Sequence, residues 1–501
     1  MKKIIAFLIT VSILLLSACQ VVDADACKHR DGDGNGVCDR CDGSVVEVID
    51  FYAVNDLHGK LADGDGHPGV DELTTYLKSA RQTDEHTVFL SSGDMWQGSS
   101  ESNMTGGMII TDWMNSLDFA SMTVGNHEFD WGEEYIESNS AAAEFPILAI
   151  NIYDRDTNER VEYCESSVMI ERGNVKIGII GAIGDCYSSI SPDKTGGVYF
   201  KVGSELTELV KEEAIGLRAL GADIIVYSLH DGHERSKNSG VITESMLSQY
   251  YDLSLSDGYV DLVFEGHTHQ SYSLVDAHGV YHLQGGGDND GITHAELAVN
   301  YVTSEVVSVN SAEVVPTYKY EPLKDDTIVA ELLEKYADEI AEANRVLGYN
   351  NIYRSSDYLR GLVAKLYLEY GEERWGEKYD IFLGGGFISV RSPYDIAAGE
   401  VTYAQVQSIF PFDNELVLCS ISGRNLKSRF LETTNSSYFI HCSAYGNENI
   451  EAIDDNATYY VIVDSYTSTY APNRLTEIER YGSPLYARDM LAEYIENGGL
   501  V

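Results

Sequence analysis

The sequence predicts an α/β protein of two domains, and three observations support this prediction. The chain has 501 residues, which is too long for a single hydrophobic core. From Val45 onward, apolar segments alternate with amphipathic ones, as buried strands alternate with the helices that cover a sheet. A boundary near Pro316–Lys324 divides this alternation into two parts. We therefore expect one α/β domain over residues 47–320 and a smaller one over residues 346–501.

The expected strands of the first domain are short apolar runs. In chain order they are Val45–Val54, Thr87–Leu90, Ala120–Val124, Ile147–Ile152, Val175–Ile183, Ala222–Leu229 and Val260–Phe264. Two later runs, Tyr281–Leu283 and Ala295–Tyr301, lie closer together in the sequence, and we expect them to be antiparallel.

Two helices are expected from the spacing of apolar residues. The segment Ser204–Leu220 should begin at a Ser204 cap, end at Gly221 and bury one face. That face consists of Leu206, Leu209, Val210 and Leu217. The segment Asp326–Asn344 also carries its apolar residues on one side. We expect this second helix, within a linker of residues 321–345, to join the two domains.

Acidic residues dominate the charge of the chain. There are 80 Asp and Glu residues against 34 Lys and Arg residues, which gives a formal net charge of −46. Such a chain repels nucleic-acid backbones, so a nucleic-acid polymer is disfavoured as a partner or substrate. An anionic substrate would need local positive charge, from a metal ion or from a cluster of arginines.

The first 19 residues predict export. Two lysines precede an apolar run, Ile4–Leu16, which is short for a membrane span and typical of a signal peptide. The next residues, Ser17-Ala18-Cys19, resemble the lipobox of bacterial lipoproteins, which implies cleavage before Cys19 and a lipid on that residue. We therefore expect an outward-facing lipoprotein of the cell membrane, at the cell surface or in a periplasm. A plain secretory signal is the alternative.

Residues 20–46 are rich in Cys and Asp, and several interpretations are open. Cys27, His29, Cys38 and Cys41 have the spacing of a zinc knuckle. Asp31-x-Asp33-x-Asn35-Gly36, followed by Asp42, is similar to a calcium loop. The cysteines could also pair as disulfides, or the segment could be an unstructured tether. We expect a small module that calcium or zinc stabilises, because so few residues rarely fold without such help.

Residues typical of metal ligands follow five of the expected strands. The segments are Asn55–Gly59, Ser92–Asp94, Gly125–Asp130, Ser228–Gly232 and Glu265–His269. Sites in α/β sheets form at the carboxyl ends of strands, so these loops should converge. Imidazoles with carboxylates suit zinc, manganese, iron or nickel, and the absence of thiolates argues against a structural zinc site. We expect two divalent metal ions, with Asp94 as the carboxylate that bridges them.

The order of these motifs, D-x-H, G-D, G-N-H-E, a lone His and G-H-x-H, resembles the calcineurin-like metallophosphoesterases over about Glu47–Val315. N-D-x-H-G and G-N-H-E-F-D together are more similar to the 5′-nucleotidase and UDP-sugar hydrolase branch. The resemblance implies a four-layer α-β-β-α domain. It also implies ligands for a first metal, Asp56, His58, Asp94 and His269, and for a second metal, Asp94, Asn126, His230 and His267.

The same resemblance implies a catalytic dyad of His127 and Asp130. His127 would stabilise the phosphoryl group or assist the leaving oxygen while a metal-activated water attacks phosphorus in line. Asp130 would hold the tautomer of His127 and raise its pKa. The alternative for Asp130 is a helix N-cap before Trp131-Gly132.

The second domain is more weakly similar to the 5′-nucleotidase C-terminal domain. In Asp380–Pro393, Arg391 precedes Ser-Pro and is the expected phosphate or ribose contact, with Arg354 as another. The segment Pro411–Asn414 implies Phe412 and Asn414 as substrate contacts, and Tyr466 would be the second aromatic of a base clamp. Tyr470–Asn473 replaces the Gly-Gly-Asp of the family. The alternative is that both aromatics belong to the core.

The expected function is the release of phosphate from nucleotides outside the cell. Two alternatives use the same chemistry on a UDP-sugar or on a 2′,3′-cyclic nucleotide. A third is a catalytically silent surface binding protein that keeps the fold without turnover. The expected partners are a nucleotide or nucleotide-sugar substrate and, through the N-terminal lipid, a membrane.

Overall fold

The computed structural model describes most of the chain. The described residues are 27–61, 69–192, 194–233, 255–324, 326–391, 394–444, 452–469, 474–483 and 485–500. The expected signal peptide with Cys19 and the segment Tyr470–Asn473 lie outside them. Within these ranges, the structure contains no helix with both the length and the apolar character that crossing a bilayer requires.

The first domain contains two six-stranded sheets. One has the strand order β14-β13-β1-β2-β3-β4. Its strands β1 to β4 are mutually parallel, and β13 is antiparallel to β1 and to β14. The bounds are β1 Val46–Val54, β2 Val88–Ser91, β3 Ser121–Thr123, β4 Ile147–Leu148, β13 Gly291–Asn300 and β14 Glu305–Pro316.

The other sheet has the order β11-β12-β10-β9-β7-β6. Strands β7, β9, β10 and β12 are parallel, whereas β6 and β11 are antiparallel edge strands. The bounds are β6 Ser167–Arg172, β7 Val175–Ile183, β9 Ile224–His230, β10 Leu262–Glu265, β11 Ser271–Val275 and β12 Tyr281–Gly285.

The two sheets pack face to face, with helices on both outer faces. A buried cluster containing Phe51 and Leu90 of one sheet and Val226 and Phe264 of the other fills the space between them. A second cluster lies on the outer face of the β1 sheet, and a third lies between the β7 sheet and α6. The helices are α2 Asp71–Thr83, α3 Ser100–Met104, α4 Met108–Ser116, α5 Glu133–Ala142 and α6 Ser204–Ala219. The α-β-β-α prediction is confirmed.

Local details differ from the expectations. The expected strand Ile147–Ile152 is two strands, because the chain leaves the β1 sheet after β4. The next strand, β5 (Ile152–Asp154), pairs with β8 (Val198–Phe200) instead. Helix α6 has Gly203 at its N-cap, and no side chain caps it, so Ser204 is the first helical residue and not the cap. Tyr281–Leu283 lies antiparallel to β11 but parallel to β10, and in a different sheet from Ala295–Tyr301.

The connection between the domains is two short helices instead of one. Helix α8 spans Thr327–Lys335 and α9 spans Ala337–Ile340, with Tyr336 between them at φ −102° and ψ 20°. The side chain of Asp326 caps α8 by accepting from the Ile328 N–H group. Val329, Leu332 and Tyr336 are part of the cluster that covers the β1 sheet, so this connection also packs onto the first domain.

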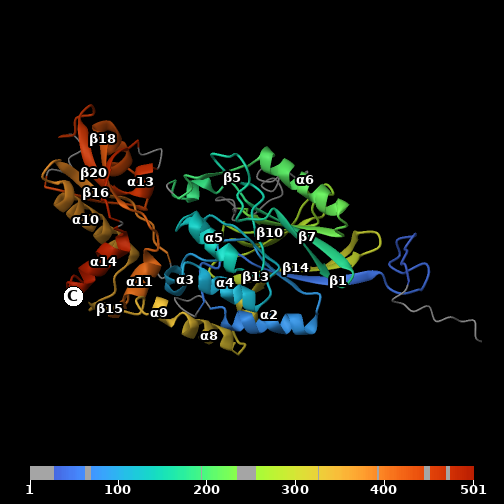
Figure 1. Cartoon of the computed structure of the whole chain (residues 1–501). Helices are drawn as coiled ribbons and strands as arrows, with labels where there is room; N and C mark the ends of the chain where they lie inside the picture. The colour runs from blue at the N-terminus through green and yellow to red at the C-terminus, as the bar shows by residue number, and fades with distance from the viewer. Residues whose placement is uncertain are drawn as a thin grey trace, which may run out of the picture.

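The second domain is built on a five-stranded sheet of order β19-β16-β20-β18-β21. A buried cluster packs α10, α11 and α14 against one face, and another covers the opposite face. The bounds are β15 Val346–Asn350, α10 Ser356–Trp375, β16 Ile381–Phe387, β17 Gly399–Thr402, α11 Tyr403–Ile409, β18 Leu416–Ser422, α12 Gly423–Leu426, β19 Tyr438–Cys442, β20 Thr458–Asp464, α13 Ser465–Thr469, β21 Thr476–Arg480 and α14 Ala487–Glu496. Figure 1 shows this domain at one end of the molecule and residues 27–44, beside β1, at the other.

Candidate metal centre and interdomain cavity

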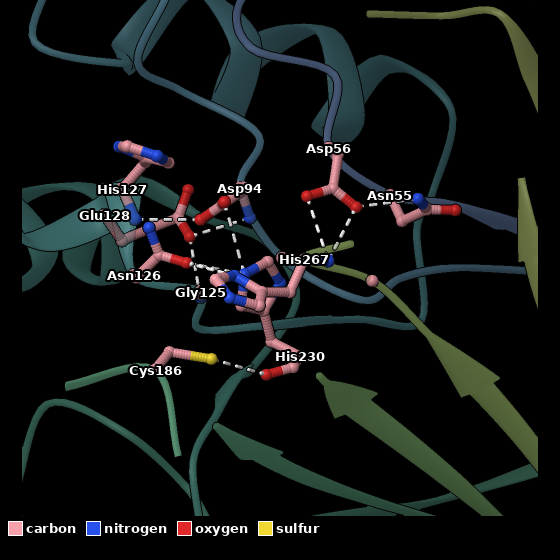
Figure 2. Close-up of polar contacts among 12 residues, drawn as sticks. Asn55, Asp56, Asp94, Gly125, Asn126, His127, Glu128, Cys186, His230 and His267 are labelled. Carbon is pink, nitrogen blue, oxygen red and sulfur yellow. Dashed lines mark hydrogen bonds and ion pairs between the residues drawn. The ribbon is translucent and has the colours of Figure 1, made fainter. Parts of the chain in front are cut away.

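The expected metal ligands converge at the carboxyl ends of strands from both sheets of the first domain. Asp56 and His58 follow β1, Asp94 follows β2 and Asn126 follows β3. From the other sheet, His230 ends β9, and His267 and His269 follow β10. The site therefore bridges the two sheets, and Figure 2 shows side chains from both pointing toward one another.

One group of ligands gathers around Asp56. The donor atoms of Asp56, His58 and His269 all lie within 4.8 Å of one another. The Nδ1 atom of His58 is 2.9 Å from the Gln97 carbonyl oxygen, which accepts only, so Nδ1 carries the proton and Nε2 carries a lone pair. That Nε2 atom lies 3.0 Å from Nε2 of His269. Two facing imidazole nitrogens of this kind fit around a shared cation.

The second group gathers around Asn126 and His230. His230 Nδ1 donates to the Ser92 carbonyl at 2.7 Å, and its Nε2 atom lies 3.1 Å from Asn126 Oδ1 and 3.2 Å from Asp94 Oδ2. His267 Nδ1 lies 2.7 Å from the same Asn126 oxygen. The Asn126 Nδ2 atom is buried without a hydrogen-bond partner. Acceptor atoms that meet so closely in a buried site fit a metal ion between them.

The electrostatics of the site also favour a cation. Burial alone would lower the pKa of His230, but the carboxylates of Asp94 and Asp56 raise it to about 10. Burial likewise opposes ionisation of Asp94, yet His230 and His127 hold its pKa well below the usual range. Asp56 lies within 4.8 Å of both Asp94 and His230, so Asp56 as well as Asp94 is placed between the two groups. The donor set therefore fits two divalent ions.

The backbone of the ligand loops is unusual. Asp56, His58, Asp94, His267 and His269 have φ values of 49°, 50°, 56°, 70° and 52°, in the left-handed region that side chains with a Cβ disfavour. Gly125 allows the close approach of two loops, since a Cβ there would lie 2.3 Å from Asp94 Oδ1. Strained conformations of this kind cluster at functional sites, where the surrounding structure maintains them.

Glu128 has a structural role that the sequence analysis did not assign. Its buried carboxylate accepts from the backbone N–H groups of Asp94 at 2.9 Å, Met95 at 2.9 Å and Gly125 at 2.7 Å. It thereby ties the loop after β2 to the loop after β3, as Figure 2 shows. The signal was present in G-N-H-E, where an acid directly follows the expected ligand and dyad residues.

The structure brings together His127 and Asp130, the two residues of the expected dyad. His127 Nδ1 lies 2.7 Å from Asp130 Oδ2, and both side chains are largely buried. The His127 backbone N–H donates to Asp94 Oδ1 at 2.8 Å, which couples the dyad to the ligand cluster. On the other side of the ring, Nε2 meets a guanidinium nitrogen of Arg391 from the second domain. Asp130 ends a 3₁₀ turn, His127–Phe129, and is not the N-cap of α5, whose cap is Gly132.

A cavity of about 310 Å³ lies between the domains and opens beside His127. Arg391, Phe412, Asn414 and Tyr466 line it, so four of the five expected substrate contacts lie together. The Arg391 guanidinium is 5.9 Å from the centre of the Phe412 ring. The other lining residues are His127, Asp130, Ser189, Ser191, Lys194, Phe387, Ser389, Val390, Tyr394 and Asp413.

The structure does not bring Arg354 to this cavity, so its expected role as a substrate contact is not supported. Its guanidinium donates to the Leu500 carbonyl at 3.0 Å and lies 4.5 Å from the centre of the Tyr358 ring. Its backbone pairs with Ile396. Arg354 therefore ties the end of the chain to the second domain.

Phe387 and Lys194 also line the cavity, although the sequence did not predict them as substrate contacts. Phe387, at the end of β16, packs 5.7 Å from Tyr466, so Tyr466 belongs to an aromatic pair. The Tyr466 hydroxyl also donates to the Ser188 carbonyl of the first domain at 3.3 Å. Lys194 places a cation in the wall of the first domain. These residues come from different domains, and their meeting depends on how the domains pack, which local sequence patterns do not encode.

Cys186 lies beside the ligand cluster. Its thiol donates to the His230 carbonyl at 3.4 Å (Figure 2). Burial, followed by the negative charge of Asp231, raises the pKa of this thiol well above its usual value. The Sγ atom also lies within 4.8 Å of donor atoms of His230 and His267, so Cys186 adjoins the second ligand group.

The facing sheets and the convergent carboxylate, amide and imidazole groups define the class of metal-dependent hydrolases. Residues 49–271 match the calcineurin-like phosphoesterase family. The chain therefore contains a calcineurin-like phosphoesterase domain, and it is a metal-dependent phosphoester hydrolase.

Two curated relatives match most of the chain. An apyrase from Tabanus yao is 27% identical over 428 residues, which cover 77% of this chain and 72% of the apyrase. A 5′-nucleotidase from Vibrio vulnificus strain CMCP6 is 25% identical over 428 residues, which cover 74% of this chain and 73% of the relative. The similarity thus extends beyond the phosphoesterase domain.

Among solved structures, a 5′-nucleotidase precursor from Thermus thermophilus has a similar fold. The TM-score is 0.66 at 18% sequence identity, and the match covers 91% of this chain and 97% of that chain. At this identity the likeness concerns the fold, and it extends over both domains.

Proposed function

We propose that this protein is an exported nucleotidase that releases phosphate from nucleotides at a two-metal centre. The observation that carries the proposal is the interdomain cavity, which is lined by His127 of the proposed dyad and by the aromatic side chains of Phe412 and Tyr466. A phosphate at the metal side and a base at the aromatic side fit such a space. The names of the apyrase and 5′-nucleotidase relatives support the same substrate class.

The proposed metal ligands are Asp56, His58, Asp94, Asn126, His230, His267 and His269. When bound there, divalent ions would supply Lewis-acid chemistry, which stabilises charge on phosphoryl oxygens and lowers the pKa of water. The identity of the ions among zinc, manganese, iron and similar metals is open.

The side chains around the phosphate would orient it and manage protons. With Nδ1 held by Asp130, His127 presents Nε2 to the cavity, where its protonated form would donate to the leaving oxygen. Arg391 meets the same Nε2 atom from the opposite domain. We propose that the guanidinium turns to the phosphate when substrate enters and offers it planar, charge-assisted hydrogen bonds.

The function is tested by phosphate release over a matched set of substrates, with metal analysis of the same sample. Nucleoside monophosphates, a UDP-sugar, a 2′,3′-cyclic nucleotide and a simple aryl phosphate separate the alternatives. We expect a kcat/KM for a nucleoside monophosphate about tenfold or more above that for the aryl phosphate, because stacking adds ~1–3 kcal/mol. Equal kcat/KM values for the two substrates would contradict the proposal that nucleotides are the preferred substrates. Bound metal without any turnover would favour the silent binding protein.

Export and anchoring are a separate proposal, which rests on the sequence of the first 19 residues. Cys19→Ala should release the protein from the membrane fraction or leave it unprocessed. Mass spectrometry of the mature N-terminus checks this. A mature protein that starts elsewhere and lacks an acyl group would contradict the lipid anchor and leave a plain secretory signal.

A further inference from the structure

A second cluster of metal-binding side chains lies at the end of the molecule opposite the second domain (Figure 1). Cys27, His29, Cys38 and Cys41 belong to the segment 27–44 that precedes β1. One donor atom from each lies within 4.8 Å of all the others. The cluster brings together two parts of the segment, C-x-H and C-x-x-C, that are separated by a loop.

The distances within this cluster match a tetrahedral site. With zinc–sulfur bonds of about 2.3 Å and zinc–nitrogen bonds of about 2.0–2.1 Å, two sulfur ligands lie about 3.8 Å apart, and sulfur and nitrogen about 3.6 Å apart. The Sγ atoms of Cys27 and Cys38 are 3.8 Å apart. Cys41 Sγ and His29 Nδ1 are 3.6 Å apart. A disulfide requires about 2.05 Å, and the three cysteines are unbridged.

The surrounding backbone favours a thiolate at the centre of the cluster. The buried sulfur of Cys38 accepts from the N–H groups of Arg30 and Arg40, each at 3.5 Å. The Arg40 side chain also links the two parts of the segment by donating to the Lys28 carbonyl at 2.8 Å. N–H donors aimed at sulfur stabilise a negatively charged ligand, which is the form that zinc binds.

The segment has little else to hold it folded. Among residues 27–45, all of which the structure describes, Cys38 and Val45 are the buried hydrophobic residues. The segment is nevertheless fixed to the first domain: Asp31 accepts from Asn300 Nδ2 at 2.7 Å, and the His29 ring packs edge-on to Tyr301 at 5.9 Å. So small a unit with a defined position needs a cross-link of its own.

We propose that Cys27, His29, Cys38 and Cys41 bind one structural Zn²⁺ ion, which folds the N-terminal segment against the first domain, beside the start of β1 and the end of β13. The set is Cys₃His, and all four tetrahedral positions come from the protein, so none is open to substrate. The calcium alternative rests on acidic side chains in a mainly exposed loop. Such side chains often cluster without binding an ion, so we do not propose a calcium site here. The site would hold a third metal ion that catalysis does not use.

The test is spectroscopic and uses the full mature chain. Replacing bound metal with Co²⁺ should produce a thiolate-to-cobalt charge-transfer band, which imidazole and carboxylate ligands do not give. We expect Cys38→Ser to remove the band and one zinc equivalent. Cys41→Ser should weaken the band. In both the Cys38→Ser and the Cys41→Ser protein, the rate of phosphate release should stay within about twofold of the unmodified protein, because the catalytic ligands are still in place.

Two matched control variants show which cysteines produce the charge-transfer band. Cys442→Ser changes a cysteine of the second domain and should keep it. Cys186→Ser changes the thiol beside the catalytic cluster and should also keep it. A band that survives Cys38→Ser, or one that Cys186→Ser removes, would overturn the proposal. So would a disulfide between any two of Cys27, Cys38 and Cys41 in the exported protein, found by mass spectrometry after alkylation of free thiols.

Discussion

The two walls of the interdomain cavity are built in different ways. Behind the wall of the first domain, Asp94 and His230 are fully buried, and Glu128 ties the Asp94 loop to the loop after β3 through carboxylate–amide hydrogen bonds. On the side of the second domain, Phe412 and Tyr466 are only partly buried. A fixed wall is suited to chemistry, which requires exact placement of charge, whereas a partly exposed aromatic wall is suited to recognition that tolerates different ligands. Variants of the two walls should therefore affect different kinetic constants.

The largest effect is expected from Asp94→Asn. The change keeps the shape but removes a negative charge that faces His230 at 3.2 Å and lies between the two ligand groups. We expect kcat to fall by about 10³-fold or more, because a bound metal ion contributes several kcal/mol of charge stabilisation. Metal content should fall in the same sample, as measured by elemental analysis. An Asp94→Asn protein with all its metal and near-normal turnover would contradict the placement of Asp94 at the centre of the site.

His127→Ala should reduce turnover without loss of metal. Its ring contacts Asp130 and Arg391 and is not within the ligand groups, so the ions should remain. Removal of a general acid typically costs about 10²–10⁴-fold in rate. Measuring kcat together with bound metal separates this variant from Asp94→Asn. Loss of both ions from His127→Ala would show that the ring belongs to the metal centre. His127 and Asp94 would then not have the separate roles that we propose.

Glu128→Gln tests whether the fixed wall depends on its supporting carboxylate. The two carboxylate oxygens of Glu128 accept hydrogen bonds from the N–H groups of Asp94, Met95 and Gly125. A glutamine side chain has only one oxygen that can accept them. We expect metal affinity and kcat to fall about 10- to 100-fold, as for other residues that orient metal ligands. Competition with a chelator measures the affinity. Glu134→Gln, an exposed position in the neighbouring helix α5, is the control and should leave both unchanged.

The smallest effect is expected from the aromatic wall. Phe412→Ala should raise KM for nucleotides about tenfold, since stacking of one ring on a base contributes ~1–3 kcal/mol. KM for a simple aryl phosphate and kcat for both substrates should change much less. Tyr466→Ala should behave similarly, although Phe387 packs beside it and could partly replace it. Equal losses for both substrates would mean that this wall supports the fold and does not select the substrate.

The sequence predicted the fixed wall better than the aromatic one, and the reason is physical. Asp56, Asp94 and His230 each follow a strong apolar strand, so strand order alone brings them to one edge of the sheets. Arg354 shows the opposite case: nothing in its neighbourhood indicated that its guanidinium would bind the Leu500 carbonyl. The cavity depends on packing between domains, and the roles of Phe387 and Lys194 appear only when both domains are in place.

The fold shows the same dependence on context. Regular apolar runs such as Val175–Ile183 were predicted at their observed bounds, because a strand buried on both faces needs no partner to be recognised. The run at Ile147–Ile152 divided into β4 and β5, since the pairing of β5 with β8 is a contact between distant segments. The helix expected over Asp326–Asn344 is interrupted at Tyr336, whose hydroxyl donates to Asp112 at 2.6 Å on α4.

The left-handed backbone of the ligand loops has a consequence for how this sequence can change. Each of Asp56, His58, Asp94, His267 and His269 holds a conformation that costs an ordinary residue about 1–2 kcal/mol. Glycine would relieve that cost at any of the five positions, but it would remove a donor atom. Local stability and metal binding thus favour different amino acids at the same sites, a trade-off that selection on activity resolves in favour of the ligand. Selection on thermal stability alone, with turnover no longer required, should therefore recover glycine at these positions first.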